Sequence, residues 1–389
     1  MSKQKARKLI IYTLGVYFSL SIAMSITYYV ASTEKDSGNF LNKISRNIVK
    51  TIVYPFKATY LYFTELNNHK IFNDKIDDGL KIYVSDDINK KLTLLTSYKN
   101  SHEFIIELVS LSSGKSIKRW YPDVKKINEL TLEGSNRLSK FSSVNVLLHP
   151  LMLKDSSIIF NTSYSLVRVD LNSKIEWIKT NFDAHHSIEL DSEKNIWISG
   201  RRLKSDLPEF IDKSDEFMDD TIMKINPDNG EVIFEKSVIQ ILKDNNIYDL
   251  VFKNGNYEKD PIHLNDVQPA LFDSDYWKKG DLLISSRHLS TIFLYRPSTN
   301  KILWYKQGPW LNQHDPNFLH GNKISIFGNQ VLRGGLQSEL VLPNKYNSVF
   351  IYDFKKNEIY EPYKLFLQSE KIKTITQGRS EVLPNGDLF

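Results

Sequence analysis

The chain has 389 residues, an apolar share of 41%, no cysteine and a formal net charge of +5 at pH 7. This length and composition suit a globular protein that can bury a core, and the lack of cysteine excludes disulfides, a thiolate nucleophile and a cysteine-ligated metal site. Residues 1–8 hold four of the positive charges, and no segment interleaves basic and aromatic residues as a nucleic-acid groove would. We therefore expect no nucleic-acid partner.

The first 31 residues have the pattern of a membrane anchor. Residues 1–8 form a basic tail, and residues 9–31 contain no charged side chain, which is a length that spans a bilayer. The small-residue site that a signal peptidase would need is poor, with Val30-Ala31-Ser32 alone available. We predict an uncleaved, single-pass signal anchor in the cytoplasmic membrane. The positive-inside rule then places the basic tail in the cytoplasm and the rest of the chain in the periplasm or exterior.

Residues 32–79 are predicted to contain a spacer and an amphipathic helix. Within them, Phe40 to Leu66 carries apolar residues at mixed three- and four-residue steps. Pro55 would kink such a helix. We expect it to pack on the following domain or to lie against the membrane surface.

From about residue 80 to residue 389 the pattern changes to short apolar runs separated by polar turns, which is typical of many short strands. One hairpin recurs five times as an alternating strand, a polar turn and a second strand that ends in an aromatic residue. A repeat unit of this size holds four strands, and four-stranded units arranged around an axis form a β-propeller. We predict an all-β propeller of about six four-stranded blades after the N-terminal transmembrane helix. The strand-to-turn junctions lie at Leu111, Asp170, Asn226, Arg296 and Asp353.

The last repeat ends in mid-strand at Phe389, so the last blade is expected to be incomplete. Either strands near Ile82 and Leu92 complete it, or the sequence is a truncated reading frame. We favour truncation, because a half-built blade leaves an open strand edge.

A second recurring element places a polar residue at the head of the first strand of each blade. In a propeller this strand is innermost, so these heads should gather at one mouth of the central channel. Returning strands should bring Asn161, Arg201, Arg287 and Asn329 beside them. In an extended strand His185 and His186 point to opposite sides, and the repeat alignment selects His186 for the channel. His288 should face away because it follows Arg287. The head residues are His149, His186, Asn265, His314 and Arg379.

Three chemistries could use this group of imidazoles. Metal binding is disfavoured because no carboxylate lies at a useful spacing and Arg287 would repel a cation. A quinone cofactor suits propellers with more blades. Transfer of an anionic group to a neutral imidazole remains, because the ordinary histidine pKa of about 6.5 leaves a nucleophile at neutral pH and arginine can stabilise the transferred charge. We predict this third chemistry, with no metal and no cofactor.

Six short segments in this order resemble the bacterial aryl-sulfate sulfotransferase family over roughly residues 145–389. The resemblance implies a six-bladed propeller outside the cytoplasmic membrane. It also implies transfer of a sulfuryl group from a phenolic sulfate ester to an acceptor phenol, with no nucleotide donor. The segments are 186–190, 263–266, 285–287, 301–304, 313–315 and 383–386.

The resemblance also implies roles for individual residues. His314 matches the histidine that becomes transiently sulfated. His263, Asn265 and Arg287 match the group that holds the sulfate oxygens and the bridging phenolic oxygen, with His263 assisting proton transfer, and His186 matches a further active-site histidine. Arg201, Asn329 and His185 are our own candidates for contacts with substrate.

Two other functions stay open at this stage. One is a non-catalytic, membrane-anchored propeller that binds a partner or an anionic glycan at the same mouth. The other is a quinoprotein-like oxidoreductase. Association of the chain with further copies of itself also stays open.

Overall fold

The computed structural model describes residues 93–99, 103–134, 146–213, 217–252, 255, 257–333, 339–341 and 346–389. These residues belong to one structural unit, Val84–Phe389. The predicted basic tail, signal anchor and amphipathic helix, residues 1–79, lie outside the described residues. Among the helices that the structure describes, none combines the length and the apolar character needed to cross a membrane.

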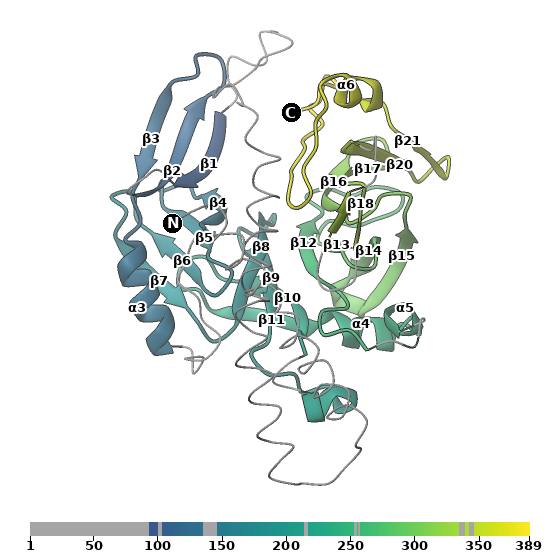
Figure 1. The fold of residues 1–389 in the computed structure, drawn as a ribbon, viewed down its shortest axis with the longest axis horizontal. Coiled ribbons are helices and arrows are strands. Elements are labelled where there is room, and N and C mark those ends of the chain that lie inside the picture. Colours follow the sequence, from purple (N-terminus) through teal and green to yellow (C-terminus); the bar gives the residue numbers. More distant parts are fainter. Residues whose placement is uncertain are drawn as a thin grey trace, which may run out of the picture. The chain divides into compact units, whose positions relative to one another are not determined.

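The described chain forms five antiparallel blade sheets (Figure 1). The first contains β1 (Thr93–Lys99), β2 (Phe104–Ser110) and β3 (Ser116–Trp120). The second contains β4 (Leu148–Met152), β5 (Ile158–Asn161), β6 (Leu166–Val169) and β7 (Ile175–Lys179). The third contains β8 (Asp183–Leu190), β9 (Ile196–Arg201), β10 (Asp220–Ile225) and β11 (Val232–Ser237).

The last two blades lead directly into the candidate site. The fourth contains β12 (Leu264–Pro269), β13 (Leu282–Ser286), β14 (Thr291–Arg296) and β15 (Lys301–Gln307). The fifth contains β16 (His314–Leu319), β17 (Lys323–Gly328), β20 (Ser348–Asp353) and β21 (Glu358–Tyr360). A two-stranded ribbon, β18 (Val331–Arg333) and β19 (Glu339–Val341), is inserted between β17 and β20.

The predicted propeller and its four-stranded antiparallel blade are confirmed, whereas the predicted number of about six four-stranded blades is corrected. Five blades are described, and the first has three strands. Helix α3 (Val124–Gly134) follows β3 in that blade. The segment after Arg379, where a sixth blade was expected to begin, contains a single β-bridge between Val382 and Leu388.

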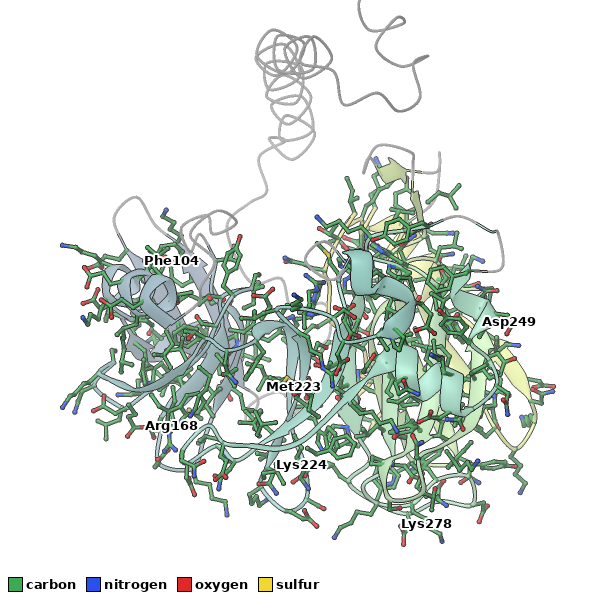
Figure 2. All side chains as sticks on the ribbon, turned by 90° about the horizontal axis from the view of Figure 1, so that it is seen from below. Phe104, Arg168, Met223, Lys224, Asp249 and Lys278 are labelled. Carbon is green, nitrogen blue, oxygen red and sulfur yellow. The ribbon has the colours of Figure 1, made fainter. Side chains whose placement is uncertain are left out.

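The five predicted hairpins are confirmed as the antiparallel pairs β2–β3, β6–β7, β10–β11, β14–β15 and β20–β21. Their common sequence pattern follows from the way the blades pack. Blades stack face to face, so a middle strand such as β14 is buried on both sides. Its odd residues, including Phe293, pack with the third blade, and its even residues, including Leu294, pack with the fifth. The same alternation on β10 sends Met223 into the core and Lys224 to the opposite face (Figure 2). Runs that are apolar on both faces are therefore what the fold requires.

Short helices fill the connections between blades. After β11 the chain enters α4 (Val238–Asp244) and α5 (Asp249–Phe252), which lie together in Figure 1. The Ser237 hydroxyl accepts a hydrogen bond from the Gln240 backbone N–H at 3.3 Å and caps α4. The buried face of α4 then joins the core between the third and fourth blades. The remaining helices are η2 (Pro208–Lys213), η3 (Pro297–Thr299) and α6 (Lys364–Ser369).

The innermost strands of four blades each carry a register shift near their heads. The shifts lie between residues 148 and 151, 185 and 188, 264 and 266, and 314 and 317. Next to them, His149, His186, His263 and Asp315 adopt left-handed backbone angles, with φ of 48°, 57°, 48° and 51°. Such conformations are uncommon away from glycine and concentrate at functional sites. Since β4, β8, β12 and β16 contact one another in sequence, the shifts gather these heads at one place.

We expect Phe293→Ala to lower the free energy of unfolding by about 3–5 kcal/mol. Phe293 is 1% exposed within the core between the third and fourth blades, so truncation leaves a cavity there. Urea denaturation followed by circular dichroism measures the change. Leu365→Ala on α6 is the control, because this side chain is 82% exposed. A loss below 1 kcal/mol for Phe293→Ala would contradict the packing described here.

Candidate functional site

Three imidazoles from three blades meet at the channel mouth. The ring of His186, on β8, lies 5.1 Å from that of His263, which precedes β12, and 6.2 Å from that of His314, on β16. We call these three residues the imidazole cluster. The sequence predicted that the heads of the inner strands would meet, and the structure brings these three together.

The hydrogen bond of His314 fixes which ring nitrogen carries the proton. His314 Nδ1 lies 2.7 Å from Asn329 Oδ1. The Asn329 amide nitrogen donates to the backbone oxygens of Thr374 and Gln377, so Asn329 Oδ1 is the acceptor. His314 Nδ1 must then donate, which leaves the lone pair on Nε2. Asn329, predicted to contact substrate, contacts this histidine.

His314 is neutral at physiological pH. Burial lowers its pKa to about 3, against the opposing effect of the hydrogen bond to Asn329. The charge of Arg287 acts in the same direction as burial. A neutral imidazole with a free Nε2 is a nucleophile that needs no prior deprotonation.

An ionised carboxylate holds His263. Asp260 Oδ2 lies 2.7 Å from His263 Nδ1, and Asp260 Oδ1 accepts from the His263 backbone N–H at 3.1 Å. Burial alone would raise the pKa of Asp260, but the hydrogen bond from His263 and the charge of Arg201 hold it well below its usual value. His263 therefore donates through Nδ1 and directs Nε2 away from Asp260.

His288 belongs to the same arrangement, and the prediction that it faces away is wrong. Its ring stacks on that of His263 at 4.2 Å, and its Nδ1 donates to the backbone oxygen of Asp260 at 2.6 Å. The strand β13 ends at Ser286, so Arg287 and His288 lie in a turn. The alternation expected of an extended strand does not apply there.

His185 and His186 lie on the same side of their strand, contrary to the prediction. The left-handed angle of His186 brings the two Nδ1 atoms to 2.8 Å. His185 Nε2 lies 3.3 Å from Asp220 Oδ1, a fully buried carboxylate that also accepts from Arg201 Nε at 3.0 Å. If His185 Nε2 donates to Asp220, its Nδ1 accepts from His186 Nδ1. The His186 lone pair is then on Nε2, as in the other two imidazoles.

Arg201 and His185 thus both contact Asp220 in this structure. The second oxygen of Asp220 accepts from the Leu264 backbone N–H at 2.7 Å and so joins the third blade to the fourth. Burial opposes the ionisation of Asp220, yet the charge of Arg201 holds its pKa below the usual value.

Amide side chains join the heads of neighbouring blades. Asn161 Nδ2 donates to the backbone oxygen of His186 at 2.7 Å, and Asn265 Nδ2 donates to that of Gln313 at 2.6 Å. The Gln313 side chain in turn donates to Ser285 Oγ at 3.0 Å. These contacts fix the backbone on which His186 and His314 stand.

Arg287 is 4% exposed, and its backbone N–H donates to His263 O at 3.1 Å. This is the neighbourhood that the sequence predicted for Arg287. After burial, its charge is a further cause that lowers the pKa of His314. A buried guanidinium beside neutral imidazoles is suited to an anionic group.

The two other head residues lie in a charged layer of the channel. Arg379 contacts Glu189 on β8 at 2.7 Å and Asp315 on β16 at 3.0 Å. The charge of Glu189 raises the pKa of Arg379 further above its usual range. Burial lowers the pKa of His149 to about 3, and the charges of Arg379 and His314 act in the same direction. These contacts join the C-terminal segment to two inner strands.

Sequence reasoning missed Asp220, Asp260 and His288. Asp220 begins β10 and has no counterpart among the repeat heads. Asp260 stands in an irregular loop, where its three-residue spacing from His263 was the one available signal. Asp260, His263 and His288 also place one ligand atom each within 4.8 Å of one another, so they could hold a metal ion, with Asp260 as the carboxylate companion that the sequence pattern lacked.

A model of a protein family, arylsulfotransferase (ASST), matches residues 149–389. None of the curated proteins matches the chain. Similar solved structures include a protein of unknown function from Bacteroides caccae, with 11% identity over 76% of this chain and 80% of that one and a TM-score of 0.45. Another is the Pan2 WD40 domain of Neurospora crassa, with 12% identity over 72% and 77% and a TM-score of 0.40. These scores are too low to support an argument about function.

We expect His149→Gln to flatten the pH dependence of stability below pH 6.5. The unfolded chain binds a proton at His149 near pH 6.5, whereas the folded chain binds it near pH 3, so folding loses stability as the pH falls between these values. Without His149, the loss of unfolding free energy between pH 6.5 and 5 should be smaller by up to about 2 kcal/mol. Urea denaturation at both pH values measures it, with the exposed His320→Gln as control. Equal slopes in wild type and His149→Gln would contradict the burial of a neutral His149.

Proposed function

Because this chain belongs to the arylsulfotransferase family, we propose that it transfers a sulfuryl group from a phenolic sulfate ester to an acceptor phenol through a sulfohistidine at His314. The observation that carries this proposal is the protonation of His314. Its Nδ1 donates to Asn329, burial lowers its pKa to about 3, and its Nε2 therefore carries the lone pair. The nucleophile and a buried cation, Arg287, stand at the same channel mouth.

In the first step His314 Nε2 attacks the sulfur of the donor. The N–S bond forms, the S–O bond to the aryl group breaks, and the phenolate leaves with the bonding electron pair. His263 in its imidazolium form donates the Nε2 proton to this oxygen. The Asp260 carboxylate, 2.7 Å from His263 Nδ1, stabilises that imidazolium.

The second step reverses these bonds with another phenol. The acceptor hydroxyl gives its proton to His263 Nε2, its oxygen attacks the sulfur, and the N–S electron pair returns to His314. Arg287 and the Asn265 amide are proposed to hold the sulfuryl oxygens in both steps, and His186 directs Nε2 toward the same space. Loose transition states of this kind depend mainly on positioning and on stabilising charge.

We also propose that the chain acts at the outer face of the cytoplasmic membrane. The basic residues 1–8 and the uncharged residues 9–31 support this placement. Donor and acceptor phenols would then be taken from outside the cytoplasm, where nucleotide donors are scarce.

We expect His314→Ala to abolish transfer. Wild-type chain incubated with a phenolic sulfate ester and quenched at alkaline pH should carry one sulfuryl group on the peptide that contains His314, together with one equivalent of released phenol. Peptide mass spectrometry measures the adduct. The matched control is His320→Ala, an exposed histidine on the same chain, which should retain the adduct and the activity.

Two results would count against this assignment. Absence of adduct and of phenol release in the folded wild-type chain would remove His314 as nucleophile. If the wild-type chain forms no adduct but still binds the phenolic sulfate ester, the non-catalytic binding propeller is favoured instead.

We expect sulfohistidine formation to persist well below pH 6.5. Burial lowers the pKa of His314 to about 3, so its neutral nucleophilic form remains populated at pH 5. The donor should have a phenol acidic enough to leave without proton transfer. The single-turnover rate should then change less than about threefold between pH 7.5 and 5, because almost all of His314 stays neutral over this range. With an ordinary histidine pKa, the rate would fall about tenfold per pH unit below that pKa. Rapid-quench measurement of the adduct tests this. A tenfold fall per unit below pH 6.5 would show that His314 titrates normally.

A further inference from the structure

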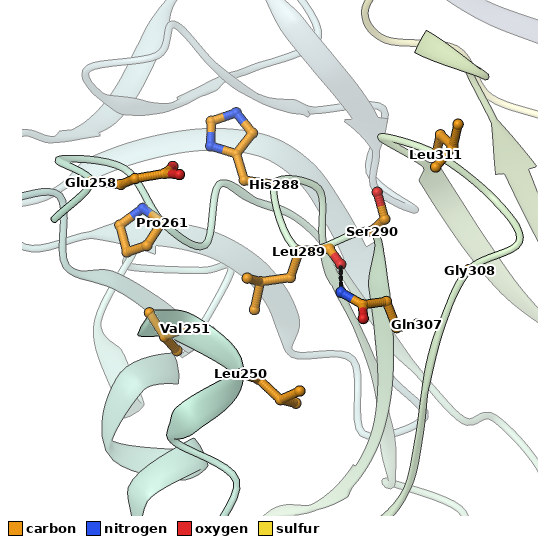
Figure 3. A pocket seen from close by; sticks show the side chains of 10 residues that line it. All are labelled: Leu250, Val251, Glu258, Pro261, His288, Leu289, Ser290, Gln307, Gly308 and Leu311. Atoms are coloured by element: carbon orange, nitrogen blue, oxygen red, sulfur yellow. Dashed lines mark hydrogen bonds between the residues drawn. The ribbon is translucent and has the colours of Figure 1, made fainter. Parts of the chain in front are cut away.

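A cavity of about 320 Å³ lies beside His288, which is one of its lining residues (Figure 3). Its lining is mixed: Leu250 and Val251 on α5, Pro261, Leu289 and Leu311 form the apolar part, and Glu258, Ser290 and Gln307 contribute polar side chains. His288 also lines it, and the same ring stacks on His263 at 4.2 Å. The cavity therefore begins one side chain away from the cluster.

Three segments of the cavity wall continue directly into the site. Pro261 precedes His263 by two residues, His288 follows Arg287, and Leu311 precedes His314 by three residues. The cavity thus opens at the end of the fourth and fifth blades where the inner strands begin. Residues of α5 close it from the other side, and Figure 3 shows Leu250 and Val251 on that helix across from Leu289.

The cavity has room for an aromatic ring. An apolar cavity of about 150 Å³ already accepts benzene, and ligand pockets usually start near 300 Å³. No lysine or arginine is among the residues that line it. With the Glu258 carboxylate in its wall and no cation, the cavity is unsuited to the anionic sulfuryl group, and its apolar side chains can contact an uncharged aryl group.

The proposed chemistry requires a single place for both phenols. In an in-line displacement at sulfur, the attacking and leaving groups lie on opposite sides of the sulfur atom. His314 Nε2 occupies one side in both steps, so the leaving phenol and the accepting phenol must use the other side in turn. We propose that the cavity between α5, His288 and Leu311 is the aryl-binding pocket for donor and acceptor alike. This inference rests on the proposed function for its substrate class.

The test is to fill the pocket from α5. In the full-length chain, Leu250→Trp should lower kcat/KM for 2-naphthyl sulfate as donor and for 2-naphthol as acceptor by tenfold or more, and for phenyl sulfate and phenol by less. Gln307 also lines the cavity but is exposed, so Gln307→Trp places a second ring in the cavity from another part of its wall. This variant should also lower kcat/KM more for the naphthyl substrates than for the phenyl substrates. Leu365→Trp on α6, at an 82% exposed position, should change neither value. Urea denaturation checks that each variant is folded.

A binding measurement separates the pocket from the chemistry. Calorimetric titration of the resting chain with 2-naphthol needs no sulfuryl transfer, and Leu250→Trp should weaken this binding at least tenfold. If both tryptophan variants keep naphthol affinity and kcat/KM within twofold of wild type, the pocket assignment is overturned, while a His314 adduct would leave the transferase function standing. If wild type binds naphthol, the variants do not, and no adduct forms, the pocket stands and the proposed function falls.

Discussion

The site depends on how the protein holds the Nδ1 atom of each imidazole. Asn329 accepts from His314, Asp260 accepts from His263, and His185 faces His186 at 2.8 Å. With Nδ1 engaged, each ring is fixed in orientation and carries its lone pair or transferable proton on Nε2. The ring of His186 lies 5.1 Å from that of His263 and 6.2 Å from that of His314, so the three rings can act on a single group. The hydrogen bonds behind them therefore decide the chemistry as much as the rings do.

The propeller supplies the rigidity that such positioning needs. Middle strands are buried on both faces, so each blade is fixed by two neighbours, and amide and carboxylate side chains such as Asn161, Asn265 and Asp220 join adjacent heads. The register shift near each head turns the backbone so that a side chain enters the channel and does not follow the strand alternation. Left-handed residues at these shifts are strained, and the surrounding contacts hold them in place. Function and strain thus coincide at the start of the inner strands.

Features that depend on a local, repeating sequence pattern could be predicted, and features that depend on contacts between distant loops could not. The hairpins were predictable because burial on both faces imposes a local pattern. The meeting of His186 and His314 followed from their recurring place in that pattern, and His263 lies two residues before the equivalent position, Asn265. The roles of Asp260 and His288 were not predictable, because a loop and a turn bring them together and neither has a periodic signal. The prediction that His185 and His186 point to opposite sides of the strand was wrong, because the left-handed backbone of His186 turns its side chain toward His185. The described residues show five of the predicted blades of about six, because the first blade has three described strands and the segment after Arg379, where the incomplete last blade was expected, forms a single β-bridge.

The distribution of charge is compatible with the proposed binding of an anion among buried carboxylates. Arg201 faces Asp220 and Asp260 and raises their tendency to stay ionised, while its own charge is balanced by them. Burial keeps His314 and His186 neutral, so these two rings add neither repulsion nor attraction of their own. Asp220 is paired with Arg201 and Asp260 with His263, so both carboxylates would repel a sulfuryl group only weakly. Arg287 is the cation proposed to hold that group. Protonation would remove the lone pair of an imidazole. The burial that lowers the pKa values of His314 and His186 therefore keeps both rings nucleophilic beside the Arg287 cation, as the proposed attack on a sulfate ester requires.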